Sequence, residues 1–93
     1  MKRAVLFCEA LMPDSRVGVV GILVEQRESA AQINMVLSEH QNIVVGRVGI
    51  PYRERGIAVI SLIIDGSTDE IGAMTGKLGR LRGVKVKTAL LMK

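Results

Sequence analysis

The chain has 93 residues, which accommodates one domain and not two, because independent cores usually need about 100 residues each. Hydrophobic residues make up 48% of it, yet it holds one Tyr, one Phe and no Trp, so the core must be aliphatic and base stacking on aromatic rings is disfavoured. The net charge is +4, and the lone Cys8 excludes both an intramolecular disulfide and a cysteine-based zinc site, which favours a reducing compartment.

The N-terminal residues are apolar from position 4 to position 12, after Lys2 and Arg3. This run resembles a signal peptide only faintly, because it is about nine residues long, is interrupted by Glu9 and lacks a small-residue cleavage pattern. We therefore expect a cytoplasmic protein without a membrane segment. Residues 1–15 are expected to be an N-terminal extension, either disordered or not native, and residues 16–93 to form the folded domain.

The first predicted strand covers residues 16–25, a run rich in β-branched side chains that ends in charge. A helix is predicted over residues 28–40, where Ala30, Ile33 and Leu37 recur at helical spacing. It starts either with a capping box of Ser29 and Gln32 or with an earlier first turn at Gln26.

Two further strands are predicted over residues 43–50 and 57–65, and the short segment PYRERG between them predicts a hairpin. Ser67 followed by Glu70 is a capping box for a second helix, which we expect to stop at Gly83. The apolar positions of this helix have helical spacing; they are Ile71, Met74, Leu78 and Leu81.

The last strand is predicted from residue 84, where Val84, Val86 and Thr88 alternate with other residues. The element order is then β-α-β-β-α-β, which predicts the ferredoxin-like split βαβ fold of the α+β class. Its four-stranded antiparallel sheet carries both helices on one face, because β-α-β crossovers are right-handed.

The second face of that sheet needs a partner, because residues 57–65 are apolar on both sides of the strand. Ile57, Val59 and Ile63 are expected on the uncovered face, and an aliphatic patch of several hundred Å² is unusual on a soluble monomer. We predict a homo-oligomer, either a dimer or a tetramer, with the apolar residues 4–12 as the alternative cover.

Three runs resemble the regulators of the iron-only hydrogenase system, small ACT-like proteins similar to the sensing domain of nickel-responsive repressors. These runs are RVGVVGILVEQRE, RVGIPYRERGIAVISLII and DEIGAMTGKLGRLRGVKVKT. The resemblance covers residues 16–93 and implies an ACT-like fold and a regulatory or sensory role without catalysis. The stretch EQRESAA lacks the Gly-containing turn of amino-acid-binding ACT domains, which disfavours amino-acid binding at that place.

The hairpin is one candidate ligand or interface site, because guanidinium groups bind carboxylate and phosphate. A solvated hairpin, bent at Gly49 and Pro51 with Arg53 paired to Glu54 or to another subunit, is the simpler interpretation and the one we weight more. The candidate residues here are Arg47, Gly49, Pro51, Arg53 and Glu54.

The second helix carries the other candidate, a stripe formed by Gly72, Gly76 and Gly79, together with Lys77. Each glycine costs the helix about 1 kcal/mol relative to alanine, so a reason must exist. Close approach of the helix to the sheet or to another helix is the favoured explanation, and a ligand against the exposed backbone is the alternative. The Gly76-Lys77 pair lacks the rest of a phosphate loop.

Other functions are less well supported. Six cations and no acid follow Glu70, which would suit nucleic acid or an acidic partner, but no groove-reading motif is present and direct nucleic-acid binding is disfavoured. His40 is the single histidine, so a metal site would need residues from more than one subunit. No nucleophile and base pattern indicates an enzyme, and the sequence leaves the cofactor unknown. A scaffold without a ligand remains an alternative.

Overall fold

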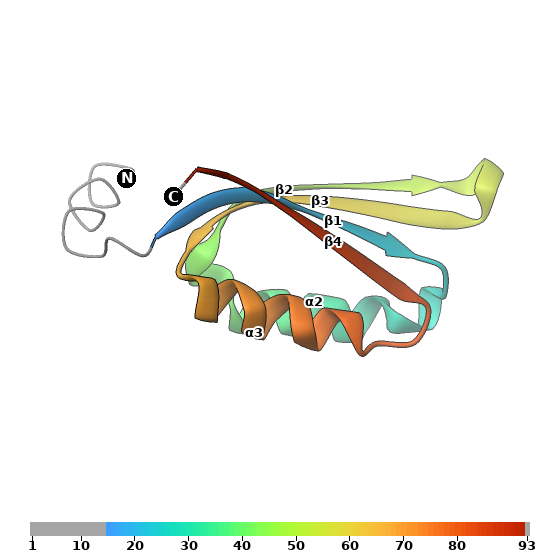
Figure 1. Cartoon of the computed structure of the whole chain (residues 1–93). Helices are drawn as coiled ribbons and strands as arrows, with labels where there is room; N and C mark the ends of the chain where they lie inside the picture. The colour runs from blue at the N-terminus through green and yellow to red at the C-terminus, as the bar shows by residue number, and fades with distance from the viewer. Residues whose placement is uncertain (1–14, 93) are drawn as a thin grey trace.

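The computed structural model describes residues 15–92, and the expectations for the N-terminal extension lie outside them. The strands and the two longer helices follow the predicted order (Figure 1). Their bounds are β1 Arg16–Val24, α2 Ala30–Glu39, β2 Val44–Tyr52, β3 Ile57–Gly66, α3 Thr68–Gly79 and β4 Val84–Met92. Three short 3-10 turns connect them: η1 Arg27–Ser29, η2 Gln41–Ile43 and η3 Arg53–Arg55.

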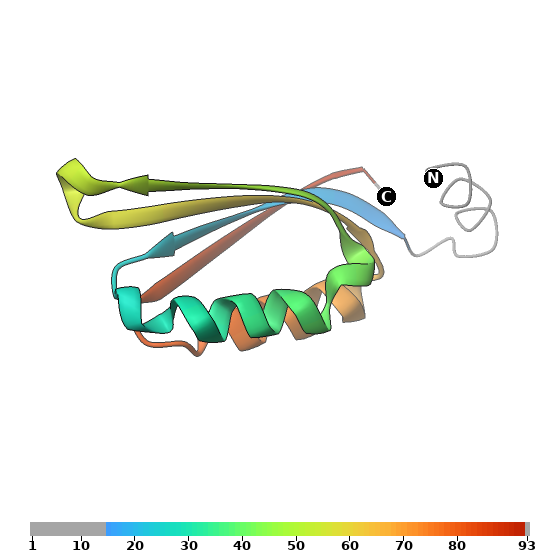
Figure 2. The ribbon, with the colours of Figure 1, turned by 180° about the vertical axis from the view of Figure 1, so that it is seen from behind.

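The four strands form one antiparallel sheet in the order β2-β3-β1-β4. Both helices lie side by side under one face of this sheet, and no described element covers the other face (Figures 1 and 2). The ferredoxin-like α+β fold predicted from the element order is therefore confirmed.

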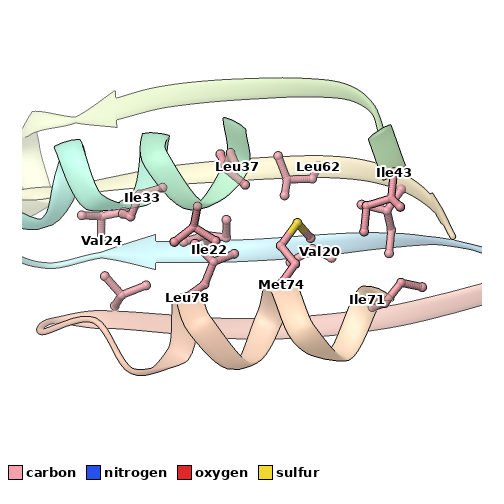
Figure 3. Close-up of a cluster of buried hydrophobic side chains, with 13 residues drawn as sticks. Val20, Ile22, Val24, Ile33, Leu37, Ile43, Leu62, Ile71, Met74 and Leu78 are labelled. Atoms are coloured by element: carbon pink, nitrogen blue, oxygen red, sulfur yellow. The ribbon is translucent and has the colours of Figure 1, made fainter. Parts of the chain in front are cut away.

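The core lies between the sheet and the helices and is entirely aliphatic (Figure 3). Val20 and Leu62 are paired at the centre of the sheet and fully buried, and Met74 and Leu78 of α3 pack against the same layer. The spacing of Ile33 and Leu37 in α2 brings both side chains into this core, as the sequence predicts.

The capping box at the start of α3 is present. The Ser67 hydroxyl accepts from the backbone N–H of Glu70 at 3.1 Å, and the Glu70 carboxylate accepts from the N–H of Ser67 at 2.9 Å. The helix ends at Gly79, before the predicted stop. Gly83, with a φ of 69°, instead turns the chain into β4.

The capping box proposed for Ser29 and Gln32 is wrong. Ser29 does precede α2, but its buried hydroxyl donates to the carbonyl of Arg82 at 2.6 Å and makes no cap bond. The earlier first turn that begins after Gln26 is present as η1. The hydrogen bond from Ser29 to Arg82 connects the start of α2 to the loop that leads into β4.

The β2–β3 hairpin extends past the ends of the helices, so its tip is an overhang of the sheet (Figure 2). Gly56 closes the tip with a φ of 68°, a conformation that glycine adopts without a steric cost. Within residues 15–92, no helix has the length and apolar character needed to cross a membrane.

The capping box provides a direct test of how α3 is stabilised. Ser67→Ala should lower the free energy of unfolding by about 1 kcal/mol, because it removes a hydrogen bond to the orphan N–H of Glu70. Urea denaturation measures the change. Ser38→Ala, on the exposed face of α2, is the control and should change stability little. Equal effects of the two substitutions would contradict the role of the cap.

Candidate functional site

The open face of the sheet is a regular array of aliphatic side chains. The register places Val59 opposite Leu23 and Ile63 opposite Val19 across β3 and β1. On the other side of β3, Ile50 stands opposite Val59. Because residues that face each other across a strand pair share one side of the sheet, these five side chains form a continuous surface.

This surface is accessible in the single subunit. Val59 and Ile63 are 41% and 43% exposed, and Val48 and Ile50 are 61% and 59% exposed. The expected outward orientation of Val59 and Ile63 is confirmed, and Ile57 is half-buried on the same side of β3. An exposed apolar patch of this kind indicates a surface that another molecule covers.

Charged groups lie along the border of the open face. Lys85 and Lys87 stand opposite Leu23 and Gly21, along the β4 edge. Asp65 faces Val17 at the end where β1 begins. An apolar area with charges at its border is the usual composition of a protein–protein interface.

A cavity of about 180 Å³ lies on the opposite side of the sheet, under the hairpin overhang. Its walls come from the end of β1, from η1 and the first turns of α2, and from the part of the hairpin next to its turn. The lining residues are Val24, Glu25, Arg27, Ala30, Ile33, Asn34, Pro51, Gly56, Ile57, Ala58 and Ile60.

The predicted hairpin residues do not all lie at the cavity. Pro51 lines the cavity. Arg47 does not, but it donates a hydrogen bond from Nη2 to Oδ1 of Asn34, a lining residue, at 3.3 Å. Gly49 lies on β2 opposite Ile60. Arg53 and Glu54 are in the exposed turn η3 and do not line the cavity.

The predicted glycine stripe lies elsewhere, in an open groove between α3 and the edge strand β4. Gly72, Gly76 and Gly79 line it together with residues of β4. A Cβ added at any of the three would meet nothing within 4 Å. Close packing of these glycines against the described part of this chain, which we favoured from the sequence, is therefore not what the structure shows.

Lys77, the fourth residue of that set, is not in the groove. Its Nζ forms an ion pair with Oε1 of Glu39 at 3.2 Å and so connects α3 with α2. Both side chains are about half exposed, so the pair contributes little to stability. The structure thus separates the two predicted sets, one near strand β2 and the other near strand β4, at opposite edges of the sheet.

Metal ligands do not gather within residues 15–92, where no group of three or more His, Cys, Asp and Glu side chains could hold an ion. His40 follows α2, and its Nε2 is buried without a hydrogen-bond partner among the described residues. A metal site shared by His40 residues of several subunits stays an untested prediction.

A comparison with protein families places the chain in one of them. Residues 16–88 match the model of the TM1266-like family, described as "Iron-only hydrogenase system regulator, putative". The chain belongs to this family. The resemblance inferred from the three sequence runs is thereby confirmed, whereas no curated protein matches the chain.

Solved structures support the same assignment. The uncharacterized protein TM1266 from Thermotoga maritima is 37% identical, with a TM-score of 0.79 over 83% of this chain and 98% of its own. An unknown protein from Galdieria sulphuraria is 12% identical, with a TM-score of 0.62 over 85% of this chain and 46% of its own. A formyltetrahydrofolate deformylase from Pseudomonas putida is 10% identical, with a TM-score of 0.58 over 78% of this chain and 28% of its own. The last two show the fold alone.

The cavity was not predicted from the sequence. It arises because the side of the hairpin that faces α2 carries small residues, while the other side of the same strands carries large ones. Pro51 and Ala58 form a pair on the cavity side, and their neighbours Ile50 and Val59 form a pair on the open face. This alternation of size could have been noticed once the hairpin register was assumed.

The empty space beside the glycine stripe leads to a stability prediction. Gly76→Ala should raise the free energy of unfolding of the subunit by about 0.5–1 kcal/mol, because alanine favours the helix and its Cβ meets no atom. Gly83→Ala is the contrasting variant. It should destabilise, since its φ is 69° and the added Cβ would lie 2.6 Å from Cγ of Gln26. Urea denaturation checks both, and a destabilised Gly76→Ala would contradict the open groove.

Proposed function

We propose that this protein is a non-catalytic regulatory module that works in the cytoplasm as a homo-oligomer assembled through the open face of its sheet. The observation that carries the proposal is the aliphatic surface of β1, β2 and β3 on the side without helices. Membership of a family described as a regulator supports the regulatory part. The lone Cys8 supports a reducing compartment.

A second copy of this chain is the occupant that best matches the size of the face. Four strands of about nine residues span roughly 19 by 30 Å, a footprint of roughly 550 Å². Specific complexes bury at least about 600 Å² per partner, and side chains that interdigitate bury more than the flat footprint. Two such faces satisfy one another because a self-complementary patch needs no other protein.

The absence of catalysis is supported by the chemistry near the cavity and the open face. The cavity lining holds one acid, Glu25, whose Oε2 lies 3.8 Å from Nζ of Lys85. The lining includes no Ser, Cys or His that could act as a nucleophile or base. The open face offers Ser61 among aliphatic neighbours, without a base in the adjacent register positions.

Direct binding of nucleic acid by the basic C-terminal third is less well supported by the structure. Two of its cations, Lys77 and Lys85, lie close to the acids Glu39 and Glu25. Lys85 and Lys87 also project from β4 toward the border of the apolar face rather than from a helix that could enter a groove.

A charge placed in the open face tests the proposed assembly. Val59→Glu should weaken self-association at least tenfold and yield a folded smaller species, because the face would bury an unpaired carboxylate. Light scattering after gel filtration gives the mass, and circular dichroism gives the fold. Met35→Glu is the matched control, since Met35 is an equally apolar residue that is 63% exposed on α2.

The two variants separate the outcomes. A folded Val59→Glu protein with the mass of the wild type would overturn assembly through this face. An unfolded Val59→Glu protein would show that Val59 is part of the core of the subunit rather than of an interface. If Met35→Glu lowered the mass instead, the interface would lie on the helices.

A further inference from the structure

The cavity under the hairpin is built from residues that leave space at a place where the rest of the sheet is filled. Farther along the strands, Leu62 and Ile64 of β3 are fully buried against the helices. Near the hairpin turn, Pro51 and Ala58 form a pair on the corresponding side of the sheet and line the cavity together with Ala30 of α2. The helices are thus present below the hairpin, but the side chains that Pro51 and Ala58 place toward them are small, and Ile60 is the next large one along β3.

The inner surface of the cavity is apolar. Val24 and Ile33 belong to the core cluster, and Ile60 packs against it, so the cavity ends on the hydrophobic core. Replacement of water in such a cavity by an aliphatic group is favourable.

The polar part of the lining has the opposite character, because it holds a cation and an amide. These are Arg27 and Asn34, and Asn34 accepts a hydrogen bond from Nη2 of Arg47, which lies outside the lining. Arg27 begins η1, which leads into α2, so the positive end of the helix dipole is at the same place. The single acid of the lining, Glu25, already faces Lys85.

From these features we infer that the cavity binds a small branched aliphatic carboxylate, with its hydrocarbon part against Val24, Ile33 and Ile60 and its carboxylate near Arg27. The one acid of the lining, Glu25, already has Nζ of Lys85 3.8 Å from its carboxylate, and an α-ammonium group would have to compete for it, so a simple carboxylate suits the cavity better than an amino acid. The inference rests on the proposed regulatory function, for which it supplies a signal molecule.

The volume limits the ligand further. An apolar protein cavity of about 150 Å³ holds a molecule the size of benzene. A cavity of about 180 Å³ that opens to solvent therefore suits about seven non-hydrogen atoms, with the carboxylate at the opening. Nucleotides are too large, and 3-methylbutanoate has the required size, branching and charge.

Titration of the full-length protein with 3-methylbutanoate, followed by NMR and by thermal denaturation, tests the inference. We expect saturable shifts of the amides of Arg27 and Ala58 and a rise in Tm of several degrees at saturating ligand. The uncharged 3-methylbutan-1-ol and the smaller acetate should each bind at least tenfold more weakly. Stronger binding of leucine than of 3-methylbutanoate would overturn the choice of a simple carboxylate.

Two variants locate the site. Ala58→Leu should fill the cavity, keep or raise the Tm of the free protein and abolish the response to 3-methylbutanoate. Arg27→Gln should weaken binding of the carboxylate at least tenfold and leave binding of the alcohol unchanged. Arg55→Gln, in the exposed turn of the same hairpin, is the matched control and should bind like the wild type.

The result is separable from that of the assembly experiment. The Val59→Glu variant, if folded and monomeric, should still bind 3-methylbutanoate, because every residue of the cavity belongs to one subunit. A wild-type protein that assembles but shows no saturable response would overturn the ligand inference alone. Binding that persists unchanged in Ala58→Leu would place the ligand elsewhere and overturn it as well.

Discussion

Two helices can cover only one face of a four-stranded sheet, and the central strands of this sheet are apolar on both faces. This constraint decides which surface of the subunit is left for a partner. The helix-facing residues Val20, Ile22, Leu62 and Ile64 form the core of the subunit. The alternate residues of the same strands form a second apolar layer that the subunit does not cover. The assembly that we propose would bury this layer between two subunits.

The β2–β3 hairpin contributes residues both to the open face and to the cavity. Ile57 and Ala58 both line the cavity, yet Ile57 is paired with Tyr52 on the side of the open face. The open face and the cavity therefore share the residues of one strand pair, which is only one layer thick. Because protein interiors are close-packed, a ligand that moves the hairpin on one side must also move the residues on the other side. A regulator of this design could link ligand binding to assembly without any additional element.

Much of the fold could be predicted from residues that act locally. The spacing of Ser67 and Glu70 predicts the cap of α3, and the alternation in residues 57–65 predicts which side chains of β3 point outward. Ser29 shows the limit of such reasoning. Its partner, the carbonyl of Arg82, is 53 residues away in the sequence, so no local pattern could indicate that its hydroxyl is used for a tertiary contact rather than a cap.

The candidate sites were less predictable, because they depend on space rather than on residue type. The glycines of α3 face an open groove, although their spacing suggested close packing. The hairpin arginines were noticed as a cluster, yet Arg47 bonds Asn34 of α2 while Arg53 lies in the exposed turn. The cavity depends on small side chains from the hairpin and from α2 that only the folded chain brings together.

Sedimentation velocity of the wild-type protein over a wide range of concentrations tests the central constraint most directly. If the open face is covered by a second copy, the protein sediments as a dimer or larger species at micromolar concentration and dissociates on dilution. A compact monomer at every accessible concentration would show that the aliphatic face remains in water, or that another part of the chain covers it.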